Sequence, residues 1–180
     1  MGFSEAYENV SQFEGGYVNN PKDRGGPTKY GITEEVARAN GYTGDMKDLP
    51  RDTAKNMAKV QYWDMIKGDD ISEFSQAIAH ELFEIGFNCG VSTAARFLQR
   101  SLNVFNRERR DYGDIKVDGV VGPVTVLTLK VFLKKRGAQG ELVLLRAINC
   151  LQGEYYVNIT ENREQDEEFV FGWYLNRIAI

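Results

Sequence analysis

The sequence has little of what metal sites, disulfide frameworks and nucleic-acid binding require. Its 180 residues include one histidine and two cysteines, and no metal-ligand spacing appears among them. We therefore predict no metal and no cofactor. Cys89 and Cys150 lie far apart in apolar runs, which predicts free, buried thiols. The formal net charge of −4 lacks the basic excess of a nucleic-acid-binding protein, so we expect no nucleic-acid partner.

Long apolar runs are missing as well. No stretch approaches the 18 apolar residues of a membrane-spanning helix, and the N-terminus lacks the basic and apolar regions of a secretory signal. We expect a protein that is not integral to the membrane and is made in the cytoplasm; a substrate outside it would need another component for delivery. Strand-like alternation is also nearly absent, which predicts a mainly α fold.

What the chain does contain is enough apolar and aromatic material for a stable core. Hydrophobic residues make up 42% and aromatic residues 12%, and a chain of this length buries roughly 70% of its unfolded surface. Basic residues gather at Arg107, Arg109 and Arg110 and again over residues 134–136. We interpret both clusters as solvated helix ends, where cations suit the helix dipole.

Helical spacing organises most of the chain. Phe3, Tyr7, Val10 and Phe13 form one face of a short helix that Gly15-Gly16 ends. Residues 17–32 are rich in turn formers and predict irregular structure or a short hairpin. Further helices are predicted from the N-cap Thr33 to residue 40 and over residues 51–66, 72–89, 92–105, 123–135 and 139–161. The weakest joint lies near Gly90, which suggests domains over residues 1–91 and 92–180.

The segment that carries chemistry is residues 14–33, which read EGGYVNNPKDRGGPTKYGIT. Glu14 sits where a helix meets a loop. It is either an ordinary exposed glutamate or a general acid, whose proton the apolar neighbours Phe13, Tyr17, Tyr30 and Ile32 would help to retain. Cleavage of a glycosidic bond needs such an acid and a second polar group for the attacking water.

Two polar residues later in the segment could serve that second role. Asp23 lies between Lys22 and Arg24, which favour its ionised form; it is either a catalytic carboxylate or a turn-forming residue. Thr28 could hold the water or take part in a turn. Tyr30 either stacks on a sugar ring or packs against the protein. Glu14, Asp23 and Thr28 resemble the acid, acid and hydroxyl of phage-type lysozymes, with a second gap one residue shorter.

The whole segment resembles glycoside hydrolase family 108, the N-acetylmuramidase family of phage endolysins and of bacterial lysis or secretion genes. The family opens with Glu-Gly-Gly-Tyr and continues Pro-x-Asp-x-Gly-Gly-x-Thr-x-Tyr-Gly-Ile, and every position is matched here. Asn20 stands where the family frequently has Asp. Residues 84–88, EIGFN, replace a more usual Asp-x-Ala-Val-Asn run but keep its asparagine, Asn88, which either lines the cleft or caps a helix.

Two later segments extend the resemblance over nearly the whole chain. Residues 118–125, DGVVGPVT, are similar to the turn of peptidoglycan-binding modules, and also predict a tight turn that feeds a helix. Residues 169–177, FVFGWYLNR, are similar to the Phe-x-x-Gly-Trp-x-x-Arg ending of the family's C-terminal module. The resemblance implies a lysozyme-like catalytic domain over residues 1–91 and a helical peptidoglycan-binding module over residues 92–180.

The resemblance implies a muramidase that hydrolyses the β-1,4 bond between N-acetylmuramic acid and N-acetylglucosamine. Glu14 would be the proton donor, Asp23 and Thr28 would orient the water, and Tyr17, Tyr30 and Asn88 would bind the glycan. The alternatives are a lytic transglycosylase and a non-catalytic peptidoglycan-binding protein. The resemblance also implies an endolysin, made in a host bacterial cytoplasm and released to the wall through a holin-type pore. We expect the protein to be a monomer.

Overall fold

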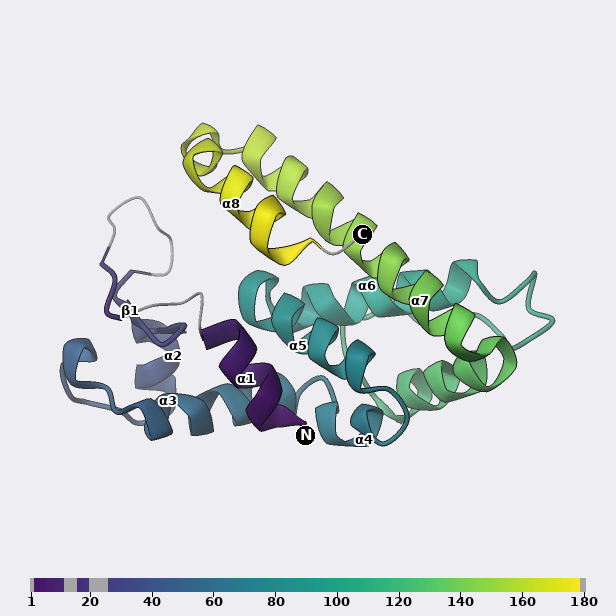
Figure 1. Cartoon of the computed structure of the whole chain (residues 1–180), viewed down its shortest axis with the longest axis horizontal. Coiled ribbons are helices and arrows are strands. Elements are labelled where there is room, and N and C mark those ends of the chain that lie inside the picture. Colours follow the sequence, from purple (N-terminus) through teal and green to yellow (C-terminus); the bar gives the residue numbers. More distant parts are fainter. Residues whose placement is uncertain (1, 12–15, 20–25, 179–180) are drawn as a thin grey trace. The chain divides into compact units, whose positions relative to one another are not determined.

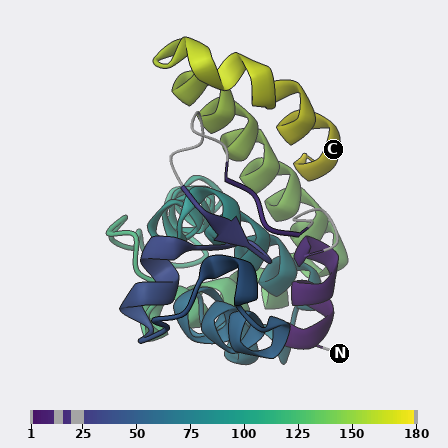
Figure 2. The ribbon, with the colours of Figure 1, turned by 90° about the vertical axis from the view of Figure 1, so that its left-hand side faces the viewer.

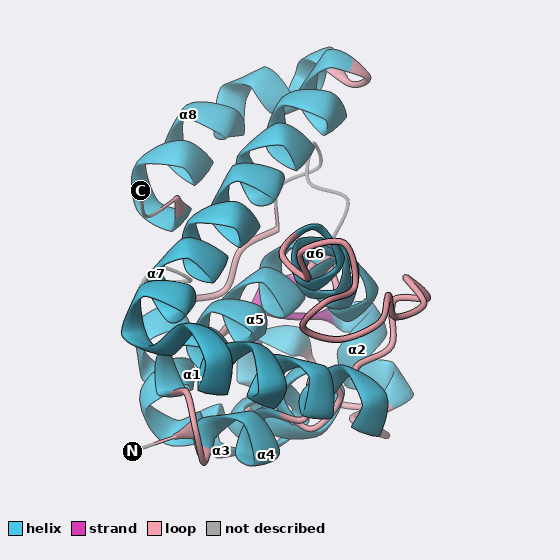
Figure 3. Ribbon diagram, turned by 90° about the vertical axis from the view of Figure 1, so that its right-hand side faces the viewer, coloured by secondary structure: helices cyan, strands magenta, loops and turns pink. Residues whose placement is uncertain are grey.

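The computed structural model describes residues 2–11, 16–19 and 26–178. Helices make up most of these residues (Figure 3), and a two-stranded antiparallel sheet completes them, so the prediction of a mainly α, lysozyme-like fold with a small hairpin is confirmed. In the described part of the chain, no helix is both long and apolar enough to cross a membrane. The chain divides into two compact units, Met1–Val91 and Ser92–Ile180, which we describe separately.

The N-terminal unit is built around helix α5 (Gln76–Cys89). Helix α1 (Phe3–Ser11) packs against it, as Figure 1 shows. The rings of Phe3, Trp63 and Phe83 lie 5.8 Å from one another, centroid to centroid, so one aromatic cluster joins both helices to the segment that carries Trp63. Trp63 and Phe83 are fully buried, and rings of this size supply much of the apolar area of a small core.

Shorter elements surround this core. They are the strands β1 (Thr28–Lys29) and β2 (Ile32–Thr33), helices α2 (Glu34–Ala39), α3 (Arg51–Ala58) and α4 (Gly68–Ser72), the 3-10 turn η1 (Met46–Asp48) and the π-helical segment η2 (Lys59–Trp63). The helix predicted over residues 51–66 is therefore α3 followed by a wider π turn. A π turn inserts one extra residue, which a search for 3.6-residue spacing does not detect.

The predicted start of the long helix at Ser72 is wrong. Ser72 ends α4, and the N-cap of α5 is Ser75, whose hydroxyl accepts a hydrogen bond from the Ile78 amide at 3.1 Å. Both serines precede an apolar run, so either could have been the cap from sequence alone. The structure decides in favour of Ser75, because its backbone is extended, as a capping residue requires.

The C-terminal unit is helical in its described residues. Helix α6 (Val91–Val104) leads through a loop to the long helix α7 (Pro123–Glu161), and the short turn η3 (Glu164–Asp166) connects α7 to helix α8 (Glu167–Arg177). Gly137 has φ of 59° and ψ of −154°, which breaks α7 between the two helices that the sequence predicts. Helix α8 packs on α7 (Figure 1): Tyr174 donates its hydroxyl proton to the Gly153 carbonyl at 2.6 Å.

Gln99 of α6 holds the DGVVGP turn that precedes α7. Its buried amide donates to Asp118 Oδ1 at 2.9 Å and to the Val120 carbonyl at 3.0 Å, and its oxygen accepts from the Gly119 amide at 3.0 Å. Gly119 has φ of 81°, and a Cβ there would lie 2.3 Å from Ser92 Oγ. The predicted tight turn is therefore confirmed, with Pro123 in the first turn of α7.

The prediction of buried cysteines is wrong for Cys150. Neither cysteine is in a disulfide, but Cys150 is exposed and Cys89 is half-buried. Cys150 lies on α7 between the buried residues Ile148 and Gln152, and two positions from a buried residue is close to the opposite face of a helix. An apolar neighbourhood in sequence therefore did not identify the face on which the thiol lies.

Candidate active site

The hairpin formed by β1 and β2 follows the predicted catalytic loop. Thr28 pairs with Thr33 and Lys29 with Ile32, and the turn residues Tyr30 and Gly31 both have positive φ, of 52° and 74°. Positive φ at both central residues is typical of a type I′ turn, whose twist matches that of paired strands. Figure 2 views the ribbon from the side on which this hairpin lies in front.

Both ends of the hairpin are fixed. Ile32 is fully buried, and the Thr33 hydroxyl accepts a hydrogen bond from the Val36 amide at 3.3 Å, which confirms Thr33 as the N-cap of α2. On the other side, Val18 and Thr28 form an antiparallel bridge with both N···O distances at 2.8 Å. The bridge places Tyr17 and its neighbours beside the strand that carries Thr28.

Thr28 has its hydroxyl partly engaged in a local turn. Thr28 Oγ1 donates to the Gly26 carbonyl at 3.0 Å. This bond uses the hydroxyl proton, so toward a water or a sugar the oxygen acts only as an acceptor. The side chain thus takes the turn role that the sequence offered, and it keeps the lone pairs that the catalytic role requires.

Tyr17 lines a hollow in the N-terminal unit. The hollow has a volume of about 330 Å³, and its walls are Tyr17, Pro27, Glu34, Arg38, Thr43, Gly44, Asp45 and Met46. Lys47 Nζ lies 5.4 Å from the centroid of the Tyr17 ring, within the range of a cation–π contact. Arg38 donates to the carbonyls of Tyr42 at 2.8 Å and Gly44 at 2.7 Å, so one wall is held by side-chain hydrogen bonds.

Tyr30, at the tip of the hairpin, is half-buried. Lys29 Nζ lies 5.2 Å from the centroid of its ring. In α1, burial raises the pKa of the Tyr7 phenol to about 12.

Sequence reasoning assigned Tyr7 only to the core. The residue is fully buried, and its hydroxyl has no hydrogen-bond partner among the described residues. An unpaired buried hydroxyl is destabilising, so it is uncommon in the core of a folded protein. The spacing of Phe3, Tyr7 and Val10 predicts burial of the ring but contains no signal for the state of its hydroxyl.

Two of the predicted catalytic residues, Glu14 and Asp23, lie outside the described residues, and so does Phe13. Tyr17 precedes Val18, which forms a bridge with Thr28 of β1, and Tyr30 lies at the turn of the hairpin. Asn88 lies on a different element, half-buried in the last turn of α5. The C-cap of that helix is Gly90, whose amide donates to the Gly86 carbonyl at 3.0 Å.

Each of the two units matches the sequence model of a known protein family. The sequence model described as glycosyl hydrolase 108 matches residues 7–90. This part of the chain belongs to the glycosyl hydrolase 108 family. The glycosyl hydrolase 108 domain contains the hairpin, the hollow at Tyr17 and the predicted acids. A second model, described as a predicted peptidoglycan domain, matches residues 93–178. The chain is thus a glycoside hydrolase with a peptidoglycan domain.

Among solved structures, the chain is similar to SagA of Brucella abortus. The two share 23% sequence identity and a TM-score of 0.70, over 95% of this chain and 86% of the other. At this identity the likeness supports the fold of the glycosyl hydrolase 108 chain and nothing about its substrate. No curated protein sequence matches the chain.

Proposed function

We propose that the chain is a muramidase that hydrolyses the β-1,4 bond between N-acetylmuramic acid and N-acetylglucosamine in peptidoglycan. The observation that carries the proposal is the union of a glycosyl hydrolase 108 domain with a peptidoglycan domain in one chain. Residues 1–91 perform the hydrolysis, and residues 92–180 hold the wall polymer. The protein acts as a monomer in the manner of an endolysin, after release from a bacterial cytoplasm through a holin-type pore.

Glu14 is the proton donor in this mechanism. Its carboxylic acid protonates the glycosidic oxygen as the bond to the anomeric carbon breaks. A water then attacks the anomeric carbon from the opposite face and passes its proton to the Asp23 carboxylate. A separation of roughly 6.5–9.5 Å between the two carboxyl groups would give inversion, whereas about 5 Å would give retention.

The hairpin supplies the remaining contacts. The Thr28 hydroxyl accepts a hydrogen bond from the attacking water, since its own proton is committed to the Gly26 carbonyl. Tyr17 and Tyr30 offer ring faces to the sugars, and Asn88 offers an amide from α5. Tyr17 already lines a hollow of about 330 Å³, large enough for a small ligand group.

The test is product analysis on purified peptidoglycan. Wild-type protein should release new reducing ends, and Glu14→Gln should reduce the rate by at least about 100-fold, the contribution typical of a general acid. Glu5→Gln, on the exposed face of α1, is the matched control and should retain full activity. Retained activity in Glu14→Gln would remove Glu14 from its role.

The same experiment separates the two alternatives. A lytic transglycosylase adds no water and leaves anhydro-sugar ends, which mass spectrometry of the fragments distinguishes from reducing ends. A non-catalytic binding protein would sediment with peptidoglycan and produce neither kind of end.

A further inference from the structure

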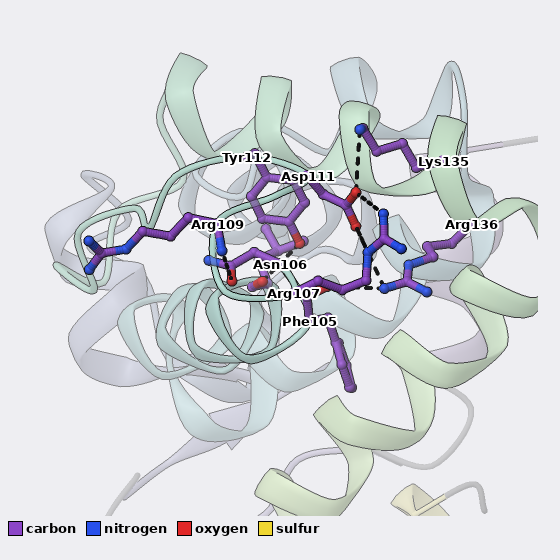
Figure 4. A network of polar contacts seen from close by, with 9 residues as sticks. Phe105, Asn106, Arg107, Arg109, Asp111, Tyr112, Lys135 and Arg136 are labelled. Carbon is purple, nitrogen blue, oxygen red and sulfur yellow. Dashed lines mark hydrogen bonds and ion pairs between the residues drawn. The ribbon is translucent and has the colours of Figure 1, made fainter.

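The two basic clusters of the sequence meet in the C-terminal unit around one carboxylate, Asp111 (Figure 4). The loop after α6 turns sharply, since Arg107, Glu108 and Arg109 all have positive φ, between 54° and 68°. Arg107, Lys135 and Arg136 stay exposed to solvent, as the sequence predicts, but they also share one acidic partner, which the sequence did not indicate. The fold brings Arg107 from the loop and two cations from α7 to the same place.

Asp111 does not balance the cations around it. Arg107 binds it at 2.9 Å through Nε and 2.6 Å through Nη2, and Lys135 Nζ lies at 3.3 Å. Arg107 and Lys135 hold the pKa of this carboxyl down, at about 2, so Asp111 is anionic at neutral pH. One negative charge thus faces three positive ones, and this local excess attracts a further anion.

Arg136 is the least committed of the three cations. Its Nη2 lies 3.6 Å from Asp111 Oδ2 and 3.5 Å from the Phe105 carbonyl oxygen, both long for a charged hydrogen bond. A guanidinium group forms two parallel hydrogen bonds with a carboxylate when the geometry allows. The Arg136 guanidinium is therefore able to donate hydrogen bonds to a second carboxylate that lies in a better position.

Arg136 also borders a hollow at the break in α7. The hollow has a volume of about 210 Å³ and is lined by Phe105, Phe132, Arg136, Gln139, Gly140 and Val143. The rings of Phe105 and Phe132 are stacked, with centroids 6.0 Å apart and planes 23° apart. Gly140 must lack a side chain, because a Cβ there would lie 2.2 Å from Arg136 Cβ. The site combines apolar walls with one cation and one amide.

The charge of this region differs from that of the whole chain. Residues 105–136 contain eight basic and four acidic side chains, whereas the chain carries a net charge of −4. An anionic ligand is therefore drawn to this part of the C-terminal unit rather than to the protein at large. The volume lies below the roughly 300–1,000 Å³ of sites for drug-sized ligands, so it suits one end of a short chain.

We propose that this hollow binds the carboxylate end of the peptide stem of peptidoglycan. The inference rests on the proposed function for its source of ligand, since peptidoglycan carries short peptides that end in alanine carboxylates. Arg136 pairs with the terminal carboxylate, the small methyl groups lie against Phe105 and Phe132, and the Gln139 amide bonds the peptide backbone. The C-terminal unit thus recognises the peptide, and the glycan is left to the N-terminal unit.

The test uses the full-length chain and a diacetylated Lys-D-Ala-D-Ala peptide, whose only charge is its terminal carboxylate. Calorimetric titration should show binding, and Arg136→Gln should weaken it at least about tenfold, as loss of a charged hydrogen-bond partner does. Val143→Asp, which adds a negative charge at an exposed position on the rim, should weaken it similarly. Arg109→Gln, whose side chain pairs with Asp114 outside the hollow, is the control and should stay within about twofold.

Several outcomes would overturn the inference. They are no binding by the wild type, equal binding of the C-terminal amide of the same peptide, equal binding by folded Arg136→Gln and Val143→Asp, or binding of a glycerol phosphate oligomer in place of the peptide. Failure of the proposed function has a separate readout, which is release of reducing ends by the wild type from glycan strands stripped of peptide. Hydrolysis without peptide binding would remove only the inference, whereas peptide binding without hydrolysis would remove only the muramidase activity.

Discussion

The two units hold their principal loops in different ways. In the N-terminal unit, the described part of the hairpin segment is fixed mainly by backbone pairing, through the Val18–Thr28 bridge and the β1–β2 ladder. In the C-terminal unit, the loops between α6 and α7 are fixed by buried amide side chains, Gln99 and Asn106, together with ion pairs. Backbone pairing leaves side chains available for a ligand, whereas a side-chain network uses them to preorganise the backbone.

The largest loss of stability should follow removal of the Gln99 amide, which holds the loop before α7 in the C-terminal unit. Gln99→Leu would leave the amide of the buried Gly119 without its acceptor and would remove one hydrogen bond each from the Val120 carbonyl and Asp118 Oδ1. We expect the free energy of unfolding to fall by roughly 3 kcal/mol, since an unpaired buried amide costs about 1–3 kcal/mol and each further lost hydrogen bond about 1 kcal/mol. Denaturant unfolding with hydrogen exchange should place the loss in residues 92–180.

The matched control for that change is Gln61→Leu in the N-terminal unit. Gln61 is half-buried and donates one hydrogen bond, to Asn40 Oδ1 at 3.2 Å. It should lose about 1 kcal/mol, the net value of an ordinary hydrogen bond. Equal losses in the two variants would mean that Gln99 does not organise its loop.

A smaller difference in stability should appear between alanine variants of two glycines that both have positive φ. Gly119 and Gly26 have φ of 81° and 61°, but a Cβ at Gly119 would collide with Ser92, whereas a Cβ at Gly26 has open space around it. Gly26→Ala should cost about 1 kcal/mol, the strain of a left-handed residue, and Gly119→Ala about 3 kcal/mol. Thermal unfolding of both variants checks the difference, and equal costs would show that the turn in the C-terminal unit relaxes freely.

Acid should weaken the charged part of the C-terminal network. The folded-state pKa of Asp111 is about 2, below the unfolded value of about 3.9, so Asp111 contributes stability above pH 4 that is lost as pH falls toward 2. Asp111→Asn should be less stable than the wild type at pH 7, and the difference should disappear near pH 2. Its partners are exposed, so the effect should be modest and should shrink in high salt. A difference that persists at pH 2 would assign the loss to packing instead.

Local signals in the sequence located most of the helices, the hairpin segment and the turn before α7. Thr33 and Pro123 mark helix starts because capping depends on a few adjacent residues. Gly137 interrupts α7 between the two predicted helices, since a glycine among polar residues permits the left-handed backbone seen there. The π turn after α3 and the cap at Ser75 escaped prediction, because both depend on how the helix ends pack rather than on spacing.

Contacts between distant residues were the part that sequence could not supply. Arg107 and Arg136 lie 29 positions apart, and only the fold brings both to Asp111. The exposure of Cys150, and the lack of a partner for the Tyr7 hydroxyl among the described residues, likewise depend on neighbours from other elements. For the candidate site, the sequence located the hairpin with Thr28 and Tyr30, and the roles of Glu14 and Asp23 stay predictions.

The smallest difference in stability should be that between two variants that each lose a tyrosine hydroxyl, one in each unit. Tyr174 donates to the Gly153 carbonyl, so Tyr174→Phe should cost about 1 kcal/mol. Tyr7 is buried with no partner for its hydroxyl among the described residues, so Tyr7→Phe removes an unsatisfied group and should be neutral or slightly stabilising. Urea unfolding of both variants measures the pair. A clear loss of stability in Tyr7→Phe would mean that its hydroxyl is bonded in solution, and a loss of glycan hydrolysis at unchanged stability would place Tyr7 beside the reacting sugar.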